Sequence, residues 1–462
     1  MKAYLETYGC QMNINETDVL SRRLRESGHD LVRTPEEADL VLLNTCSIRE
    51  HAESKVLSRL GVLRKLKEQG EIQMLGVTGC MAQRLGGEFL AKAPFLDLVI
   101  GSGAYPRFFD ALAKRKATDR PVVDVGFAED FTFEDRPRIE SGSVKTFITI
   151  IRGCDNSCHY CIVPTTRGYE RSKPLGRILQ EAEWCVSQGI REITLLGQNV
   201  NHYRWEGQGL AECLLEVARV RGIERVRYTT SHPGYMTRDV LEAMASDPRI
   251  MPQLHLPLQS GCDRVLASMN REYTLEGYLD LVNYARELMP GFALSTDIIV
   301  GYPAETREEF DETYRAMETI RFDSAFMFKF SPRRGTVAAG LEDDVPPTEK
   351  QRRLASIIEL QRRVTAESSA AQIGKEVEVL VDGTSRRDPG LFTGKTREFR
   401  SAVFPGKPEW MGTLRRIRVE SARGVTLKGL PLGETIPDRN GSGAQGSQIP
   451  NMSAGAALKG TD

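Results

Sequence analysis

The sequence predicts an α/β protein with an N-terminal βα sandwich, a central partial (β/α)6 barrel and a small C-terminal all-β barrel. Strand-like segments alternate with helical periodicity through the first 371 residues, and six such units recur after residue 144. Period-two alternation broken by Gly and Pro replaces this pattern near the C-terminus. The predicted domains are residues 1–125, 144–371 and 372–434, with a linker at 126–143 and a disordered tail at 435–462.

Composition narrows the class of protein before any motif is considered. The chain has 462 residues, of which 40% are apolar, enough for ordinary cores. We find no apolar signal region near Met1 and no run of 18 apolar residues, so we expect a cytoplasmic protein without membrane contact. In that reducing compartment, nine cysteines, an odd number, indicate metal ligation or catalysis rather than disulfides.

Three strand-like segments in the N-terminal domain each end in a cysteine. "MKAYLETYGC", "EADLVLLNTC" and "EIQMLGVTGC" end at Cys10, Cys46 and Cys80, and each interval between them has the length of one βαβ unit. Parallel strands of this kind bind ligands beyond their carboxyl ends, where all three thiols fall. The alternative is that each cysteine is a small buried hydrophobe, the usual role of a free thiol. Matched positions on three strands favour a shared site.

The six predicted strands of the barrel also end in polar residues or glycine. A βα barrel carries its chemistry at the carboxyl face, so we expect the functional residues at this rim. Thr306 and Glu309, just beyond the rim, form a capping box that predicts the start of a helix. The rim residues are Gln198, Asn199, Ser231, His232, Gln259, Ser260, Gly301, Lys329 and Ser331.

The first barrel strand, "FITIIRGC", leads into a loop with three cysteines, Cys154, Cys158 and Cys161. A zinc site would need a fourth ligand, and His159 has little room to turn inward between its neighbours. Iron–sulfur clusters are usually held by four thiolates, so three on a cubane leave one iron without a protein ligand. That iron can bind a substrate. An iron–sulfur site is therefore favoured over zinc.

The CxxxCxxC spacing with Tyr160 before the last cysteine resembles the radical S-adenosylmethionine superfamily. Over most of the chain, the sequence is similar to the radical methylthiotransferases, which join three N-terminal cysteines, the radical loop and an RNA-binding TRAM domain. The matching blocks are "TYGCQMNINETD", "NTCSIREHAESK", "VTGCMAQRLG", "GCDNSCHYCIVPTTRG", "LHLPLQSG" and "STDIIVGYPAET". Within the family, "TYGCQMN", "LLGQNVNHY" and "RYTTSHP" resemble the enzymes that act on tRNA.

This resemblance implies two [4Fe–4S] clusters, one on Cys10, Cys46 and Cys80 and one on Cys154, Cys158 and Cys161. It implies that S-adenosylmethionine serves both as methyl donor and as radical source. The implied reaction replaces the hydrogen on carbon 2 of N(6)-isopentenyladenosine, at position 37 in the tRNA anticodon stem-loop, with a methylthio group. A reducing partner such as flavodoxin or ferredoxin would supply electrons, and we expect a monomer.

The same resemblance gives candidate contacts for the cofactor and the RNA. S-adenosylmethionine is expected to contact Tyr160, Gln198, Gln259, Ser260 and Gly301. Residues 372–433 hold 12 Lys and Arg against 7 Asp and Glu, an excess suited to phosphate contacts, and Phe392 and Phe399 are candidates to stack on bases. The expected RNA contacts are Asn199, Asn201, Tyr203, Arg386, Arg387, Arg415 and Arg416.

Two other functions remain open from the sequence. A methylthiotransferase acting on a ribosomal-protein aspartate would carry a first block like "GCPKN" where this chain has "GCQMN". An iron–sulfur RNA-binding sensor without turnover would leave the polar rim of the barrel unexplained. The remaining cysteines, Cys185, Cys213 and Cys262, lie in or beside helical patterns and are expected to be core thiols.

Overall fold

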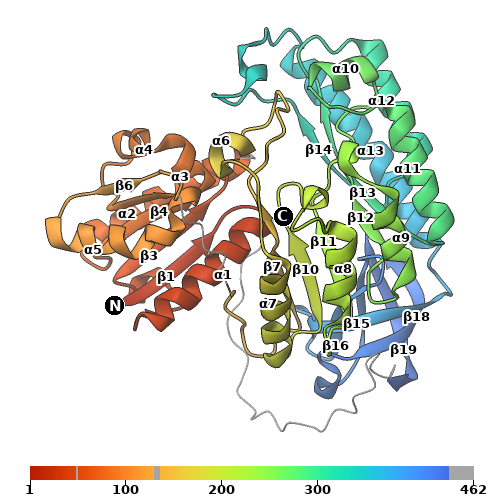
Figure 1. Ribbon diagram of the computed structural model, residues 1–462, viewed down its shortest axis with the longest axis horizontal. Coiled ribbons are helices and arrows are strands. Elements are labelled where there is room, and N and C mark those ends of the chain that lie inside the picture. Colours follow the sequence, from red (N-terminus) through yellow and green to blue (C-terminus); the bar gives the residue numbers. More distant parts are fainter. Residues whose placement is uncertain (48–49, 129–135, 436–462) are drawn as a thin grey trace. The chain divides into compact units, whose positions relative to one another are not determined.

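The computed structural model describes residues 1–47, 50–128 and 136–435. Contacts divide these residues into two compact units, one within residues 1–128 and one within 136–435 (Figure 1). Parts of the predicted linker, 129–135, and of the predicted tail, 436–462, lie outside the described residues. Among the helices in the described ranges, none is long and apolar enough to cross a membrane.

The first unit is a parallel six-stranded sheet with strand order β2-β1-β3-β4-β5-β6. The strands are β1 (Lys2–Thr7), β2 (Asp30–Leu31), β3 (Leu40–Thr45), β4 (Met74–Gly79), β5 (Leu98–Gly101) and β6 (Val122–Asp124). The helices are α1 (Gln11–Glu26), α2 (Glu50–Glu68), α3 (Cys80–Leu85), α4 (Gly87–Lys92) and α5 (Phe108–Thr118).

The central strand β3 shows why this sheet is covered on both faces. Leu40 and Leu42 pack in one core cluster, whereas Val41 and Leu43 pack in another, and each is at most 1% exposed. Alternate residues of a strand point to opposite faces, so a continuous apolar strand needs a layer on each side. The predicted N-terminal βα sandwich is therefore confirmed.

The second unit contains two three-stranded parallel sheets, β11-β10-β7 and β12-β13-β14. A parallel bridge links Val226 on β11 to Ile250, three residues before β12, so six strands follow one another from β7 to β14, as the sequence predicts. In the described chain no ladder joins β14 back to β7, which leaves an open barrel. Its strands are β7 (Lys145–Thr149), β10 (Glu192–Leu196), β11 (Arg225–Thr229), β12 (Gln253–His255), β13 (Ala293–Val300) and β14 (Ser324–Lys329).

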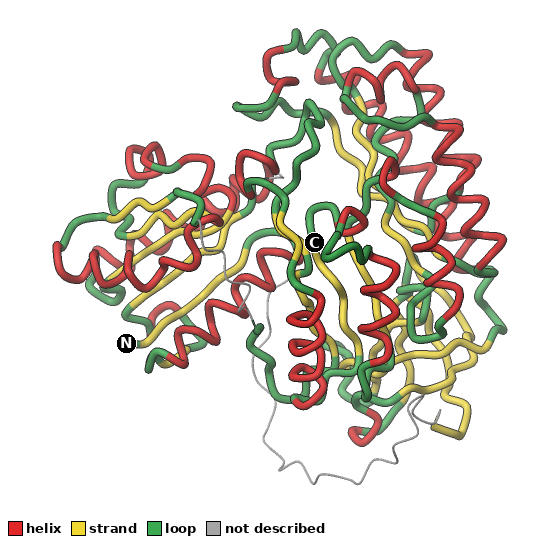
Figure 2. Tube along the Cα trace, in the orientation of Figure 1, coloured by secondary structure: helices red, strands yellow, loops and turns green. Residues whose placement is uncertain are grey.

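Helices pack outside the strands of the open barrel, as Figure 2 shows in red and yellow. The short helix α10 (Asp263–Ser268) belongs to a separate small core cluster with Tyr302 and Phe330. The helices outside the strands are α7 (Leu175–Ser187), α8 (Leu210–Arg219), α9 (Arg238–Ser246), α11 (Leu275–Leu288), α12 (Arg307–Ile320) and α13 (Pro347–Ala370). On β13, Ile298 and Val300 are buried in the core shared with these helices, whereas Ser295 and Asp297 are half-buried on the other face. We call that other face the inner face of the open barrel.

The first barrel strand is shorter than the sequence predicts. β7 ends at Thr149, and the next residues form β8 (Ile151–Arg152), which pairs antiparallel with β9 (Arg171–Ser172) outside the barrel. The backbone of Ile150 marks the change, because its N–H donates to Leu196 O in the barrel while its oxygen accepts from Lys173 N. The short helix α6 (Val163–Arg167) follows.

Five strands at the end of the described chain close into the predicted small barrel, β15-β16-β17-β19-β18, which we call the C-terminal barrel. They are β15 (Glu376–Thr384), β16 (Leu391–Thr396), β17 (Ser401–Pro405), β18 (Leu414–Arg423) and β19 (Thr426–Thr435). Phe392 is 3% exposed in the core of this barrel, so its ring is packed against protein rather than presented to RNA bases.

The C-terminal barrel packs against the amino-terminal ends of the open barrel strands through two buried arginines. Arg225 donates to Lys395 O at 2.6 Å and to Glu378 Oε1 at 3.0 Å. Arg227 donates to Arg397 O and Thr396 O at 2.9 and 2.8 Å. Glu192, whose Oε1 lies 3.2 Å from Arg227 Nε, supplies the opposite charge. The two arginines lower its pKa although burial opposes the shift.

Replacing Arg227 with Ala should destabilise the protein by about 3 kcal/mol, because it removes the closer partner of a buried carboxylate and leaves carbonyls of the C-terminal barrel unsatisfied. A matched control is Arg418→Ala, since Arg418 forms a solvent-exposed pair with Glu376. That change should cost at most about 1 kcal/mol. The free energy of unfolding in urea, measured for both variants, checks this expectation. Equal losses for the two variants would contradict it.

Candidate functional site

The first unit brings Cys10, Cys46 and Cys80 to one edge of its sheet. β1, β3 and β4 are neighbours, and each cysteine follows the carboxyl end of one of them. Cys46 and Cys80 are both 2% exposed, whereas Cys10 is half-buried. The alignment of strand ends that the sequence predicts therefore places three thiols on three adjacent loops.

Two asparagines that the sequence analysis missed hold these loops together. Asn13 Nδ2 donates to Asn44 Oδ1 at 2.9 Å, and Asn44 Nδ2 returns a bond to Asn13 O at 2.9 Å. The thiol of Cys10 lies 3.4 Å from Asn13 Oδ1. A Cβ on Gly9 would lie 2.9 Å from Cys46 Cβ, so only glycine allows the loops to approach this closely. Asn44 is a polar residue near the end of an apolar strand, and this position could have indicated from the sequence that it has a role at the site.

The second unit places Cys154, Cys158 and Cys161 in the loop between β8 and α6, which we call the cysteine loop. The loop folds back on itself, because Cys154 N donates to Gly168 O and Cys161 N donates to Cys158 O. Gly153 has φ +78°, and a Cβ there would lie 2.1 Å from Tyr169 O. Glycine is therefore required where the strand enters the loop.

Burial raises the pKa of two of the three thiols in the cysteine loop. It raises the pKa of Cys154 to about 11 and that of Cys161 to about 12, with a further contribution from the neighbouring Cys158 in each case. Thiolates in such a place need a metal to displace the proton. Across the described ranges, no three His, Cys, Asp or Glu side chains converge closely enough to hold a single metal ion.

Arg271 is a positive charge beside the cysteine loop that the sequence analysis did not identify. It is 8% exposed, and its Nη1 lies 3.4 Å from Cys158 Sγ. The guanidinium is fixed by the hydroxyl of Tyr273, 3.1 Å from Nε, and by the carbonyl of Pro257. Tyr160, predicted to contact the cofactor, has its pKa raised by burial in the same region. Arg271 can therefore balance negative charge on the thiolates.

The predicted cofactor residues have different surroundings. Gln198 Oε1 accepts from Gly153 N at 2.6 Å, which ties the end of β10 to the cysteine loop. Ser260 is fully buried with its hydroxyl 3.2 Å from Thr313 on α12, and Gln259 pairs with Ile298. Gly301 has φ +68° and follows β13 directly. The capping box of Thr306 and Glu309 starts α12 as predicted.

The three residues predicted to contact RNA near β10 are all buried. Tyr203 is 0% exposed and donates its hydroxyl to Lys173 O, while Asn201 exchanges two 2.8 Å hydrogen bonds with the backbone of His232. These two residues support the rim rather than face RNA. Asn199 differs, because it is 1% exposed and neither its amide nitrogen nor its oxygen has a hydrogen-bond partner in the structure. A buried amide of this kind indicates a missing ligand or water.

His232 is held neutral at the end of β11. Its ring Nδ1 accepts from Gly234 N at 3.1 Å, and burial lowers its pKa to about 3. Tyr235 packs 5.0 Å from the His232 ring and donates its hydroxyl to Asn156 Oδ1 in the cysteine loop. Tyr235 therefore connects the end of β11 to the cysteine loop by a hydrogen bond. The neutral ring of His232 adds no positive charge there.

The basic residues of the C-terminal barrel are not equivalent. Arg386 and Arg387 lie exposed in the loop between β15 and β16, and Arg416 is exposed on β18. Arg415 is instead 9% exposed, with its guanidinium 4.3 Å from the centre of the Trp410 ring. Phe399 is 47% exposed and lies against Arg227 and Lys395. Arg415 is thus packed into the protein, whereas Arg386, Arg387 and Arg416 are exposed.

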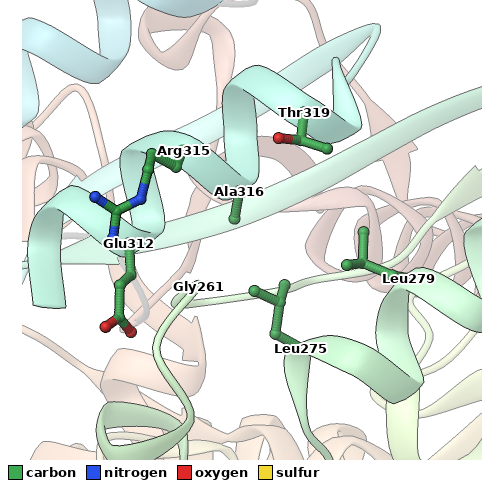
Figure 3. A pocket seen from close by; sticks show the side chains of 7 residues that line it. All are labelled: Gly261, Leu275, Leu279, Glu312, Arg315, Ala316 and Thr319. Atoms are coloured by element: carbon green, nitrogen blue, oxygen red, sulfur yellow. The ribbon is translucent and has the colours of Figure 1, made fainter.

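A shallow groove of about 250 Å³ lies between α11 and α12 (Figure 3). It is a mixed surface with one acidic and one basic side chain and no cysteine. The lining residues are Gly261, Leu275, Leu279, Glu312, Arg315, Ala316 and Thr319. This groove is not part of either group of cysteines.

Comparison with known proteins supports three regions of similarity. The uncharacterized protein family UPF0004 matches residues 2–101, the radical SAM superfamily matches residues 148–317, and the TRAM domain matches residues 370–432. The three matches fall in turn on the N-terminal sheet, on most of the open barrel and on most of the C-terminal barrel.

Solved structures share the fold at low identity. A cobalamin-dependent S-adenosylmethionine radical enzyme, OxsB, superposes with a TM-score of 0.52 over 78% of this chain and 56% of its own, at 14% identity. The radical S-adenosylmethionine methyltransferase TsrM from Kitasatospora setae, with cobalamin and a [4Fe-4S] cluster bound, gives 0.51 over 71% and 74%, also at 14%. These similarities concern the fold alone.

Relatives with assigned names match across nearly the whole chain. A tRNA-2-methylthio-N(6)-dimethylallyladenosine synthase of Clostridium botulinum is 42% identical over 92% of this chain and 96% of its own length. The enzyme of the same name from Sulfurihydrogenibium is 39% identical over 94% of this chain and all of its own. At this identity and coverage, the chain belongs to the tRNA-2-methylthio-N(6)-dimethylallyladenosine synthase family.

Proposed function

We propose that this protein is a tRNA-modifying methylthiotransferase that replaces the carbon-2 hydrogen of N(6)-dimethylallyladenosine, at position 37 of tRNA, with a methylthio group. The observation that carries the proposal is the presence of two separate groups of three cysteines, one at the carboxyl ends of three parallel strands and one within the cysteine loop. The names and coverage of the relatives support the same reaction. No observation favours a protein aspartate as the substrate or a sensor without turnover.

The cofactors of this reaction are S-adenosylmethionine and [4Fe–4S] clusters. When bound, they supply the one-electron and sulfur-transfer chemistry that an unactivated aromatic C–H bond requires. The residues present fit such clusters, because each group offers three thiols on loops whose close packing depends on glycine. In this proposal one cluster is held by Cys10, Cys46 and Cys80, and the other by Cys154, Cys158 and Cys161.

The rest of the site holds and insulates these ligands. Gln198 fixes the entry to the cysteine loop through Gly153, and Arg271 places a positive charge beside Cys158. Neutral His232 adds no charge at the rim. Preorganised charge in a buried site needs no reorganisation during the reaction, so this arrangement favours negative charge at the cysteine loop.

The proposal extends to domain boundaries and partners. We assign residues 1–125, 144–371 and 372–434 to the cluster-bearing, radical and RNA-binding domains. A low-potential donor such as flavodoxin or ferredoxin would supply single electrons. A monomer is sufficient, because one chain provides both groups of cysteines. A cytoplasmic location follows from the tRNA substrate.

Reconstituted enzyme should contain about eight irons per chain, as two cubanes require. Changing Cys154, Cys158 and Cys161 to Ala should halve the iron and abolish cleavage of S-adenosylmethionine. Changing Cys10, Cys46 and Cys80 should also halve the iron but leave that cleavage intact, and no methylthio nucleoside should form. Iron analysis and mass spectrometry of nucleosides from treated tRNA measure these outcomes. A wild type that forms no 2-methylthio product would overturn the proposed function.

Asn199 is assigned to S-adenosylmethionine, because its buried amide lacks partners and Gln198 beside it reaches the cysteine loop. Asn199→Ala should weaken binding of S-adenosylmethionine about tenfold to a hundredfold, the usual worth of a hydrogen bond to a charged group. The iron content should not change. Equilibrium binding, with the exposed Asn283→Ala as control, tests this assignment. Unchanged affinity in Asn199→Ala would exclude it.

The exposed pair Arg386 and Arg387 is assigned to RNA phosphates, together with Arg416. Replacing the pair with Ala should weaken tRNA binding and lower the slope of log affinity against log salt by about 0.7 to 0.9 per lost contact. The loss should be similar for different tRNA sequences, since phosphate contacts carry no sequence information. The matched control replaces Arg362 and Arg363, an adjacent exposed pair on α13. If both double variants lower the slope equally, the assignment to the C-terminal barrel fails.

A further inference from the structure

The edge strand β14 presents an aromatic side chain on the inner face of the open barrel. Ala325 and Met327 pack against the core shared with the helices, so Phe326 and Phe328 point the opposite way. The register pairs Phe326 with Asp297, which also lies on the inner face. Phe326 is 50% exposed, an unusual state for a ring on the inside of a barrel.

Neighbouring polar groups fix the position of the Phe326 ring. The His255 ring meets it edge to face, with 6.0 Å between the ring centres. His255 is itself held, because its Nδ1 lies 3.0 Å from Ser295 Oγ and its Nε2 lies 3.5 Å from Asp297 Oδ2. The inner face around Phe326 therefore combines one apolar ring with several polar groups.

Phe326 lies inside the open barrel at a depth set by the strand. It precedes Lys329, the last residue of β14, by three positions, which corresponds to about 10 Å below the carboxyl edge. The cysteine loop and Asn199 lie at that edge, while the C-terminal barrel covers the opposite ends of the strands. A group that reaches Phe326 from the cysteine loop has to extend into the barrel.

We propose that Phe326 is the contact surface for the dimethylallyl side chain of the substrate adenosine. The inference rests on the proposed function and names the part of the substrate that this residue contacts. A nucleotide base offers polar edges, which suit His255 and Asp297, whereas its branched hydrocarbon substituent requires apolar surface. In this proposal the phosphates stay outside the barrel, and the base with its substituent is the part of the RNA that reaches this depth.

The test compares two anticodon stem-loops that differ only in carrying dimethylallyladenosine or unmodified adenosine. For the alkylated RNA, Phe326→Ala should lower kcat/KM about 10-fold to 200-fold, the range for a hydrophobic group in a pocket. Activity on the unmodified RNA should stay at its wild-type level. Phe326→Leu should restore most of the preference. Affinities of the two RNAs, measured by fluorescence anisotropy, provide a readout that does not depend on turnover.

Leu57→Ala is the matched control, because Leu57 is 46% exposed and lies on α2 of the first unit, outside both the open barrel and the proposed RNA-binding barrel. Intact cluster absorbance establishes that each variant is folded. The inference is overturned if Phe326→Ala keeps the wild-type preference, if it weakens both RNAs equally, or if wild type binds both RNAs alike. A wild type that discriminates in binding yet forms no methylthio product would refute the proposed reaction and leave the alkyl contact standing.

Discussion

Parallel pairing of strands is the constraint on which both candidate cluster sites depend. Every strand in a parallel sheet ends at the same edge, so residues far apart in the sequence meet there once each follows its own strand. Cys10, Cys46 and Cys80 meet in this way across three βα units. The cysteine loop also lies at the carboxyl edge of parallel strands, in the second unit. All three of its thiols, however, come from one connection. The first site therefore depends on the whole sheet, and the second depends mainly on a local fold.

The opposite ends of the strands serve a different purpose. Arg225 and Arg227 point from the inner face of β11 into carbonyls of the C-terminal barrel, with Glu192 as the buried counter-charge. A buried guanidinium needs several acceptors to offset its loss of water. This requirement fixes the C-terminal barrel to the end away from the cysteine loop. Under the proposed function, an RNA that contacts both regions spans the length of the strands.

Periodicity and spacing predicted the layers, the open barrel and the closed barrel, because these depend on patterns repeated within short segments. They could not predict the pairing of Asn13 with Asn44, 31 residues apart, or the approach of Arg271 to Cys158, 113 residues apart. The same limit explains the candidate RNA contacts that are buried. Tyr203 and Phe392 look like surface residues beside polar neighbours, and only the folded chain shows them packed inward. Local polarity indicates a rim but not the direction of each side chain.

Cofactors of this class supply reactivity but little selectivity, since a species able to remove hydrogen from one unactivated carbon can remove it from many others. Selection therefore falls to the protein, which has to bring one atom of one base to the cysteine loop. An open barrel is suited to this task, because a substrate that enters at the rim can be selected by how far it extends into the barrel. In the inference drawn above, the exposed ring of Phe326 and polar groups such as Asp297 together hold a base that carries a hydrocarbon substituent in one orientation. The reaction at the rim and the recognition of the substituent below it then depend on the same geometry of the open barrel.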